Sequence, residues 1–184
     1  MISAAFAAAA TTNTPNTCQV IRHIHSSVSE TISGQSADLS KRMNKPISED
    51  EYLQIVARKT APLLSLPVEL AFIHAGKSEF LALLKPCITA YSIAYQIFDD
   101  ISDTEIDHIE GNLNIVNMLS RELSYYLAVQ KATRLAEESL NKFNLLADKI
   151  PFGCGEILKQ LPSNMDNAIF TPNIETMKPR HVHA

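Results

Sequence analysis

Several residue types are scarce in this chain of 184 residues, and each shortage excludes a class of structure. Tryptophan is absent and glycine occurs only five times. A β-sandwich or β-barrel of this length needs many glycine-containing turns, so the composition favours helices joined by few turns. Hydrophobic residues make up 46% of the chain and charged residues 20%, which is the composition of a globular protein and not of a disordered one.

Cysteine is also rare, and the three cysteines, Cys18, Cys87 and Cys154, are far apart. Their spacing excludes a zinc site built from CxxC pairs and a disulfide framework. Free thiols are typical of a reducing compartment, so we expect a cytoplasmic location. The first 29 residues contain no Asp or Glu, which leaves an organelle transit peptide as the alternative.

The chain also has no excess of basic over acidic residues and no long apolar run. The chain has 16 Lys and Arg against 20 Asp and Glu, a formal net charge of -4. This balance excludes an overall basic surface, so no nucleic-acid partner is expected. No run reaches the roughly 18 apolar residues that a membrane-spanning helix needs, so no transmembrane segment is expected.

Apolar residues recur at helical spacing along the middle of the chain. Between residues 18 and 39 they return every four positions, the stripe of one amphipathic helix. Ser48 and Glu51 have the spacing of a capping box and open a second helix. A long apolar helix is expected over residues 79–103 and an amphipathic one over residues 124–147. No segment shows a convincing strand pattern, so the sequence predicts an all-α fold.

Prolines and polar stretches suggest where these helices stop. Pro67 is expected to end the second helix, because proline lacks the backbone N–H of a helix interior. For the same reason Pro86 predicts a kink or a local break in the third helix. Residues 104–112 are polar and contain a glycine, so a loop is expected there.

Turn-forming residues near both ends set the expected domain organisation. Residues 1–17 end in a polar, proline-containing stretch and are expected to be a flexible leader. Residues 18–161 form a single helical domain in this interpretation. Residues 162–184 are polar and contain prolines, so we expect a disordered tail.

Four side chains near the end of the third helix carry the strongest chemical signal: Gln96, Asp99, Asp100 and Asp103. At 100° per residue they fall within an arc of about 100° on one helix face. Carboxylates at a helix C-terminus oppose the macrodipole and repel one another, and a divalent cation reverses that balance. Hard oxygen ligands suit Mg²⁺, which bridges carboxylates to phosphates. The pattern predicts a Mg²⁺–diphosphate site; the alternative is a solvated acidic helix end.

Two further segments support a phosphate site. Lys59 and Thr60 follow one another about forty residues before the aspartates, and an ammonium beside a hydroxyl is a common phosphate-binding pair. The alternative for Lys59 is a solvated helix residue. Gly34 and Gln35 begin the sequence GQSADL at the end of the first helix, where a C-cap glycine is the alternative interpretation.

Taken in order, these three segments resemble the C-terminal half of the trans-isoprenyl diphosphate synthases, the polyprenyl synthetase family. The family pattern is GQxxDL, then a tyrosine-led helix that ends in KT, then QxxDDxxD. Here the three segments are residues 34–39, 52–60 and 96–103. The resemblance covers about residues 20–145. It implies an all-α helical bundle of the isoprenoid synthase type, in which the motifs face one deep cavity.

The resemblance also implies roles for the acidic residues. Asp99, Asp100 and Asp103 match the second aspartate-rich motif of the family, whose members are Mg²⁺ ligands, with Asp99 as the leading ligand. Asp99 and Asp100 are therefore expected to be catalytic together with Lys59. The implied cofactor is Mg²⁺.

The substrate-binding residues follow from the same resemblance. Lys59 and Thr60 match residues that contact the allylic diphosphate, and Gln96 lies beside that group. The implied reaction is ionisation of an allylic diphosphate, attack by isopentenyl diphosphate on the allylic cation, and proton loss. Magnesium and Lys59 would neutralise the departing diphosphate while an apolar pocket excludes water.

The chain departs from the family pattern upstream of Gly34. Only 33 residues precede that glycine and their sole acid is Glu30, so the first aspartate-rich motif is missing and the bundle is expected to be truncated on its N-terminal side. Residues 99–120 also contain no Lys or Arg, where the family usually has basic residues. Two alternatives therefore stay open: a catalytically incomplete partner subunit, or a truncated fragment of a full-length synthase. A homodimer, or a heterodimer with a complete synthase, is the expected assembly.

Overall fold

The computed structural model describes residues 2–11, 14–41 and 46–162. Within these ranges the chain forms eight α-helices and one short 3-10 helix, with no strand. The all-α class predicted from the sequence is confirmed. The segment predicted to be a disordered tail lies outside the described residues from residue 163 onward.

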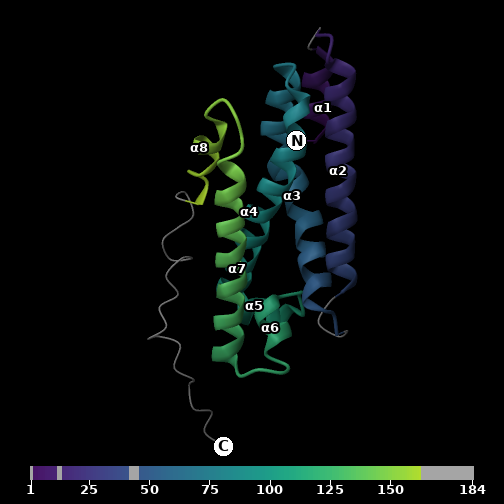
Figure 1. Cartoon of the computed structure of the whole chain (residues 1–184). Coiled ribbons are helices and arrows are strands. Elements are labelled where there is room, and N and C mark those ends of the chain that lie inside the picture. The colour runs from purple at the N-terminus through teal and green to yellow at the C-terminus, as the bar shows by residue number, and fades with distance from the viewer. Residues whose placement is uncertain (1, 12–13, 42–45, 163–184) are drawn as a thin grey trace, which may run out of the picture.

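Four long helices form the body of the molecule: α2 (Thr17–Ser40), α3 (Glu49–His74), α4 (Leu81–Ser102) and α7 (Tyr125–Ala147). Helix α2 packs along α3, α3 packs along α4, and α4 packs along α7 (Figure 1). Helix α4 therefore lies between α3 and α7 and forms the centre of the bundle.

The core is built around the apolar face of α4. Cys87, Ile88 and Ile97 are fully buried there, and the ring of Tyr91 packs 5.3 Å from the ring of Phe143 in α7. By length and composition alone the segment Ser78–Ser102 could cross a membrane. Its apolar side chains instead fill the bundle core, as expected of the central helix of a helical domain.

Helix α3 begins as the sequence predicts but ends later. The hydroxyl of Ser48 accepts a hydrogen bond from the backbone N–H of Glu51 at 3.1 Å, which confirms the helix cap. The prediction that Pro67 ends this helix is wrong, because α3 continues through Pro62 and Pro67 to His74. Each proline removes one helical hydrogen bond, and packing of α3 between α2 and α4 outweighs that loss.

The third helix also differs from the prediction. A 3-10 turn, Ser78–Phe80, precedes α4, and α4 runs without interruption past Pro86. The predicted break is therefore not observed. Leu84 and Cys87 on either side of the proline are almost fully buried, so tertiary contacts hold this turn in helical form.

Short helices surround the C-terminal end of α4. Residues 104–112 were expected to be a loop, but they contain α5 (Thr104–Glu110), which ends at Gly111 in the left-handed conformation with φ 70°. Asn114 caps α6 (Ile115–Leu119), which also packs on α4. The remaining short helix, α8 (Cys154–Leu158), follows α7 and packs on it.

Near the N-terminus, the segment 1–17 that was expected to be a flexible leader contains α1 (Ile2–Thr11), which packs on α2.

Candidate functional site

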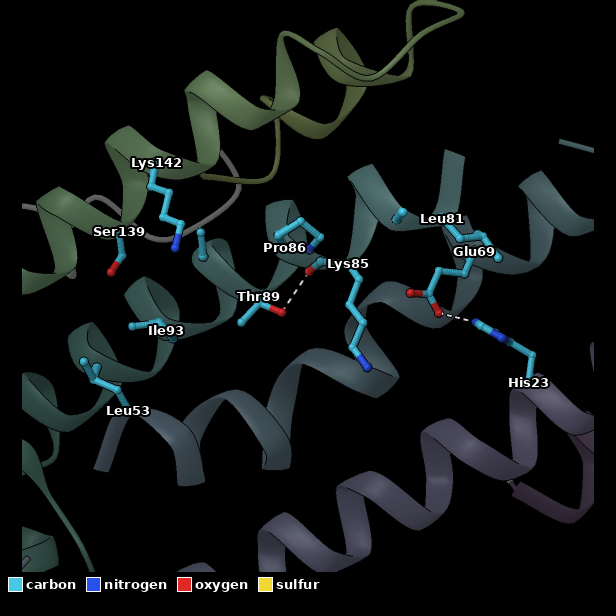
Figure 2. Close-up of a pocket in the computed structure, with 12 residues that line it drawn as sticks. His23, Leu53, Glu69, Leu81, Lys85, Pro86, Thr89, Ile93, Ser139 and Lys142 are labelled. Carbon is cyan, nitrogen blue, oxygen red and sulfur yellow. Dashed lines mark hydrogen bonds and ion pairs between the residues drawn. The ribbon is translucent and has the colours of Figure 1, made fainter. Parts of the chain in front are cut away.

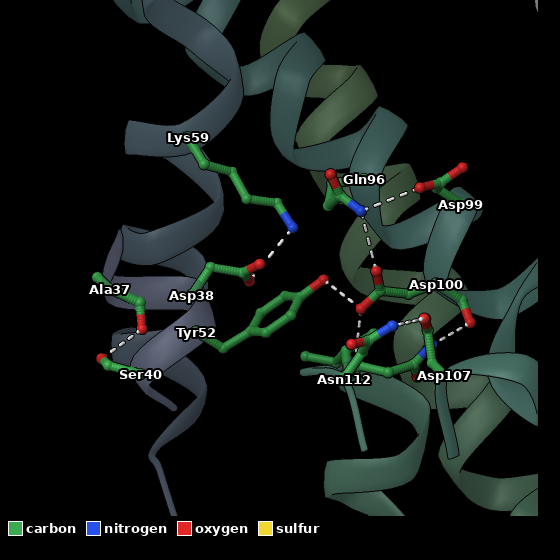
Figure 3. A network of polar contacts seen from close by, with 12 residues as sticks. Ala37, Asp38, Ser40, Tyr52, Lys59, Gln96, Asp99, Asp100, Asp107 and Asn112 are labelled. Atoms are coloured by element: carbon green, nitrogen blue, oxygen red, sulfur yellow. Dashed lines mark hydrogen bonds and ion pairs between the residues drawn. The ribbon is translucent and has the colours of Figure 1, made fainter. Parts of the chain in front are cut away.

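The two adjacent aspartates of α4 lie in different environments. Asp100 is only 2% exposed, and both of its carboxylate oxygens have protein donors. Its Oδ2 accepts hydrogen bonds from the Tyr52 hydroxyl at 2.8 Å and from the backbone N–H of Ile115 at 2.7 Å. Its Oδ1 accepts from Nε2 of Gln96 at 3.1 Å (Figure 3). Asp100 thus joins α3, α4 and the start of α6.

Burial dominates the acidity of Asp100. Loss of water raises its pKa from 3.8 to about 7, although the Ile115 amide, the Gln96 amide and the Tyr52 hydroxyl each favour the charged form. A side chain held in this way is a structural member of the site. Its oxygens are directed at protein donors, two at Oδ2 and one at Oδ1.

Asp99 and Asp103 are the carboxylates that remain available. Asp99 is half-buried and accepts one hydrogen bond, from Nε2 of Gln96 at 3.1 Å. Asp103, one helical turn later, is exposed at the junction of α4 and α5. Burial raises the pKa of Asp99, and the neighbouring charge of Asp103 raises it further. Two like charges a turn apart are the electrostatic arrangement that a bound cation relieves.

Lys59 faces these carboxylates from α3. Its Nζ lies 3.2 Å from Oδ1 of Asp38, and both side chains are about 15% exposed, at 16% and 15%. The positive charge of Lys59 lowers the pKa of Asp99 and of Asp100, so the ammonium acts across the gap between the two helices. In Figure 3 its side chain extends toward Asp38 and Gln96. Thr60 follows in the same helix and is half-buried.

The structure places Gln96 beside Asp99 and Asp100 on α4, with Lys59 on α3 close enough to act on both carboxylates. That these residues form one binding site stays a prediction. The sequence predicted that the three acids share one helix face, but their environments differ: Asp100 is buried, Asp99 half-buried and Asp103 exposed. Asp100 turns into the protein because Tyr52 and the Ile115 amide supply buried donors for it.

Gly34 fixes the position of Lys59. It lies inside α2, six residues before the helix ends, and so is not the C-cap that was considered from the sequence. A Cβ atom at this position would lie 2.4 Å from the carbonyl carbon of Arg58 and 2.4 Å from the backbone nitrogen of Lys59. Arg58 also donates from Nη2 to the Ser33 hydroxyl at 2.6 Å. Only glycine allows α2 to cross α3 this closely beside the lysine.

Two members of the site lie within the sequence motifs without having been assigned a role there: Tyr52 and Asp38. Tyr52 precedes Lys59 by seven residues, or two helical turns, and this spacing could have placed both on one face of α3. Asp38 follows Gly34 by four residues on α2. Their partners lie 48 and 21 residues away, a separation that local spacing does not reveal.

Asn114 was missed altogether. Its Nδ2 donates to the backbone carbonyl of Asp100 at 2.6 Å and to Oδ2 of Asp107 at 2.9 Å, while its Oδ1 caps α6. This buried amide ties the short helices to the end of α4.

The donor set suits a hard cation that is shared with a ligand. Among the described residues, no three His, Cys, Asp or Glu side chains are grouped so that they could hold a metal ion by themselves. Asp99 and Asp103 offer carboxylate oxygens, and Mg²⁺ is typically bound by one or two carboxylates together with phosphate oxygens and water. The residues present therefore fit magnesium in the company of a phosphate.

The helical arrangement is that of the isoprenoid synthases. The structure matches the geranylgeranyl pyrophosphate synthetase of the archaeon Geoglobus acetivorans with a TM-score of 0.72 at 21% identity. The match covers 86% of this chain and 60% of that one. At this identity the likeness concerns the fold.

Sequence comparison identifies the family. The polyprenyl synthetase family matches residues 1–142, and the chain belongs to that family. It is 37% identical over 78 residues to an all-trans-nonaprenyl-diphosphate synthase (geranyl-diphosphate specific) of Rhodobacter capsulatus. It is 31% identical over 115 residues to a geranylgeranyl diphosphate synthase of Sulfolobus acidocaldarius. These segments make up 42% and 62% of this chain but only 24% and 34% of the two relatives, so the match spans about a quarter to a third of their length.

Proposed function

We propose that this chain binds an allylic diphosphate through Mg²⁺ and takes part in its condensation with isopentenyl diphosphate. One observation carries the proposal: the carboxylate of Asp99 lies close enough to the carboxylate of Asp103 and to the ammonium of Lys59 on α3 for both charges to act on its pKa. Carboxylates recruit a cation, and the ammonium attracts the anionic ligand. Membership of the polyprenyl synthetase family supports the choice of substrate class.

Asp99 and Asp103 are the residues that would hold magnesium. When bound, Mg²⁺ would neutralise charge on the diphosphate and so make it a better leaving group. Asp100 is instead a positioning residue, because its oxygens already accept three hydrogen bonds. Gln96 donates from Nε2 to Asp99 and to Asp100 and so bridges these two carboxylates.

Lys59 would act on the diphosphate directly. In the proposed reaction the bond between the allylic carbon and the diphosphate oxygen breaks, and the diphosphate leaves with the electron pair. The double bond of isopentenyl diphosphate then forms a carbon–carbon bond with the allylic cation, and a proton is lost. Lys59 stabilises the negative charge that develops on the leaving group, while Asp38 holds the ammonium in place until the ligand arrives.

Calorimetry with Mg²⁺ and inorganic pyrophosphate tests the binding step without requiring turnover. We expect saturable binding by the wild type, and a loss of affinity of about tenfold or more for Asp99→Asn or Asp103→Asn. Asp50→Asn is the control, since Asp50 is an exposed aspartate at the start of α3. Equal affinity in all four proteins would overturn the assignment of the site. A Mg²⁺-dependent assay with geranyl and isopentenyl diphosphates then tests the condensation.

The second candidate function is a catalytically incomplete subunit that pairs with a complete synthase. Exposed apolar side chains on α2 favour it, since Ile32 is 61% and Leu39 53% exposed. Light scattering of the chain alone and mixed with a complete family member distinguishes the two candidates. A monomer with its own turnover would contradict the subunit hypothesis. A truncated fragment is tested by searching the DNA upstream of Met1 for an in-frame aspartate-rich motif.

We also propose a reducing, cytoplasmic location. The three cysteines are free thiols, and Cys87 is buried in the core, where no second cysteine is paired with it.

A further inference from the structure

A pocket of about 370 Å³ lies between the C-terminal part of α3 and the turn that joins α7 to α8, and we refer to it as the α3–α8 pocket. Helix α3 contributes four residues of one face: Val68, Ala71, Phe72 and Ala75. The other lining residues are Lys77, Phe152 and Cys154. Among these described residues Lys77 is the one with a charged side chain, so an apolar surface is combined with a single ammonium.

The α3–α8 pocket is separate from the candidate site. In Figure 1, α8 lies at the opposite end of the bundle from α5 and α6, which adjoin the aspartates. Phe152 and Cys154 also follow residue 142, where the match to the polyprenyl synthetase family ends. A segment outside the family match therefore builds part of this pocket.

A larger pocket, of about 730 Å³, lies on another side of α3. Glu69 lines it and bonds to Nε2 of His23 in α2 (Figure 2). At 100° per residue, the four α3 residues of the α3–α8 pocket centre roughly 110° round the helix axis from Glu69. The two pockets therefore open on different faces of α3.

Ring contacts hold Phe152 beside the α3–α8 pocket. Its backbone has φ 64°, in the left-handed region that residues with a side chain rarely adopt. Its ring meets that of Phe80 edge to face, with the centroids 5.5 Å apart, and lies 6.5 Å from that of Phe72. Aromatic pairs in such arrangements attract one another and stabilise this turn. The residue is still 65% exposed, so much of its surface is available to a ligand.

The ammonium of Lys77 lies beside the same ring. Its Nζ is 5.7 Å from the ring centroid of Phe152, within the range of a cation–π contact. In the part of the chain that the structure describes, Lys77 forms no ion pair with a carboxylate, whereas Lys159 after α8 pairs with Asp148 and Glu156. An ammonium without a carboxylate partner at the edge of an apolar pocket is complementary to an anionic group on an apolar ligand.

We propose that the α3–α8 pocket binds a small molecule with a compact apolar body and a single carboxylate, with the body against Phe72 and Phe152 and the carboxylate beside Lys77. The volume lies at the lower end of the range of small-molecule pockets, which favours a compact body over a long hydrocarbon chain. One ammonium balances one negative charge, whereas a diphosphate carries more charge and is held by several donors. The ligand therefore differs in class from an allylic diphosphate, and the inference does not depend on the proposed function.

The thiol of Cys154 can report on occupancy, because it lines the pocket and is partly exposed. Cys18 is exposed on α2 and serves as the internal reference. The full chain is alkylated with N-ethylmaleimide, and mass spectrometry of the peptides gives the rate at each cysteine. Three probes are compared: naphthoate has the apolar body and the charge, naphthamide has the body alone, and acetate has the charge alone.

We expect protection of Cys154 that depends on both parts of the probe. At about ten times its dissociation constant, naphthoate should slow alkylation of Cys154 by about tenfold, while Cys18 reacts at an unchanged rate. Naphthamide should bind about threefold to fivefold more weakly, because it forms no charge pair with the exposed ammonium. Acetate, and Mg²⁺ with inorganic pyrophosphate, should leave the rate at Cys154 unchanged.

Two variants test the lining residues. Lys77→Gln should lower the affinity for naphthoate about threefold to fivefold, to that of naphthamide. Ala71→Leu places a larger side chain in the pocket and should weaken binding of both probes by about tenfold. Lys149→Gln is the matched control, since Lys149 is an exposed lysine close to the same turn that does not line the pocket. Circular dichroism and thermal melting establish that each variant is folded.

Three results would overturn the inference. The first is an unprotected Cys154 at the solubility limit of naphthoate, and the second is equal affinity for naphthoate in the wild type and in folded Lys77→Gln. The third is alkylation of Cys154 that slows as the protein concentration rises without any probe, which would assign this face to contact between copies of the chain. Failure of pyrophosphate binding at the aspartates would leave the protection by naphthoate intact, so failure of the proposed function is seen separately.

Discussion

The hydroxyl of Tyr52 donates a hydrogen bond to Oδ2 of Asp100 at 2.8 Å, with both side chains almost completely buried. This bond connects the helix that carries Lys59 to the helix that carries the aspartates. Since Gln96 donates to Asp100 and to Asp99, the connection extends from Tyr52 to the exposed side of the site. The relative position of cationic and anionic groups thus depends on a buried phenol.

Removal of that hydroxyl should destabilise the protein. Tyr52→Phe leaves Asp100 with one donor fewer in a buried position, and we expect a loss of about 1–3 kcal/mol in the free energy of unfolding. Urea denaturation measures it. Tyr126→Phe is the matched control, because the hydroxyl of Tyr126 accepts a hydrogen bond from Gln130 at an exposed site. Equal losses in the two variants would contradict the role assigned to Tyr52.

The acidity of Asp100 makes stability depend on pH. Its pKa is raised from 3.8 to about 7 by burial, so between these values the unfolded chain has released a proton that the folded chain retains. Folding stability from this group is therefore greatest at acidic pH and falls as pH rises toward 7, by up to roughly 4 kcal/mol. Asp100→Asn should flatten this part of the profile, measured by chemical denaturation at several pH values. Asp50→Asn should leave the slope as it is in the wild type.

Gly34→Ala should disturb both the fold and the site. The added Cβ would overlap the backbone of Arg58 and Lys59, so α2 must shift away from α3. We expect a destabilisation of about 1–3 kcal/mol and weaker binding of Mg²⁺–pyrophosphate. Ser36→Ala, an exposed position of the same helix, serves as the control. An unchanged melting temperature for Gly34→Ala would show that the crossing is less tight than described.

Replacing Asp38 or Lys59, which form an ion pair, should change the affinity for pyrophosphate in opposite directions. Lys59→Gln removes the ammonium and should weaken pyrophosphate binding about tenfold or more. Asp38→Asn frees the ammonium from a competing carboxylate and should tighten binding by a smaller factor. Calorimetry distinguishes these outcomes, with Lys131→Gln as the control for a lysine paired elsewhere. Weaker binding in Asp38→Asn would mean that the carboxylate itself helps to bind the ligand.

Structural features that depend only on residues close together in the chain could be predicted from the sequence. The cap at Ser48 depends on residues three positions apart, and the stripe over residues 18–39 depends on one helix. Pro67 and residues 104–110 were interpreted wrongly for the opposite reason. Their helical form depends on packing against distant segments and on a cap at Gly111, and these override local propensity.

The sequence predicted some residues of the candidate site and missed others, such as Asn114, and it did not predict the direction of the Asp100 side chain. The sequence predicted one helix that carries Gln96 and Asp99, and α4 does carry them, while Asp103 is the residue directly after its C-terminal end. The inward turn of Asp100 depends on Tyr52 and on the amide of Ile115, which approach it from other helices. No spacing within α4 contains that information.

The proline at position 62 has an effect one turn earlier in α3. In a regular helix the carbonyl of Arg58 would accept the amide hydrogen of residue 62, but proline has none. A Cβ at position 34 would lie 2.7 Å from that same carbonyl oxygen. The N–H that Pro62 lacks and the side chain that Gly34 lacks would both meet the carbonyl of Arg58. A substitution at either position therefore alters the backbone directly before Lys59. A redesign of this helix crossing should change both positions together.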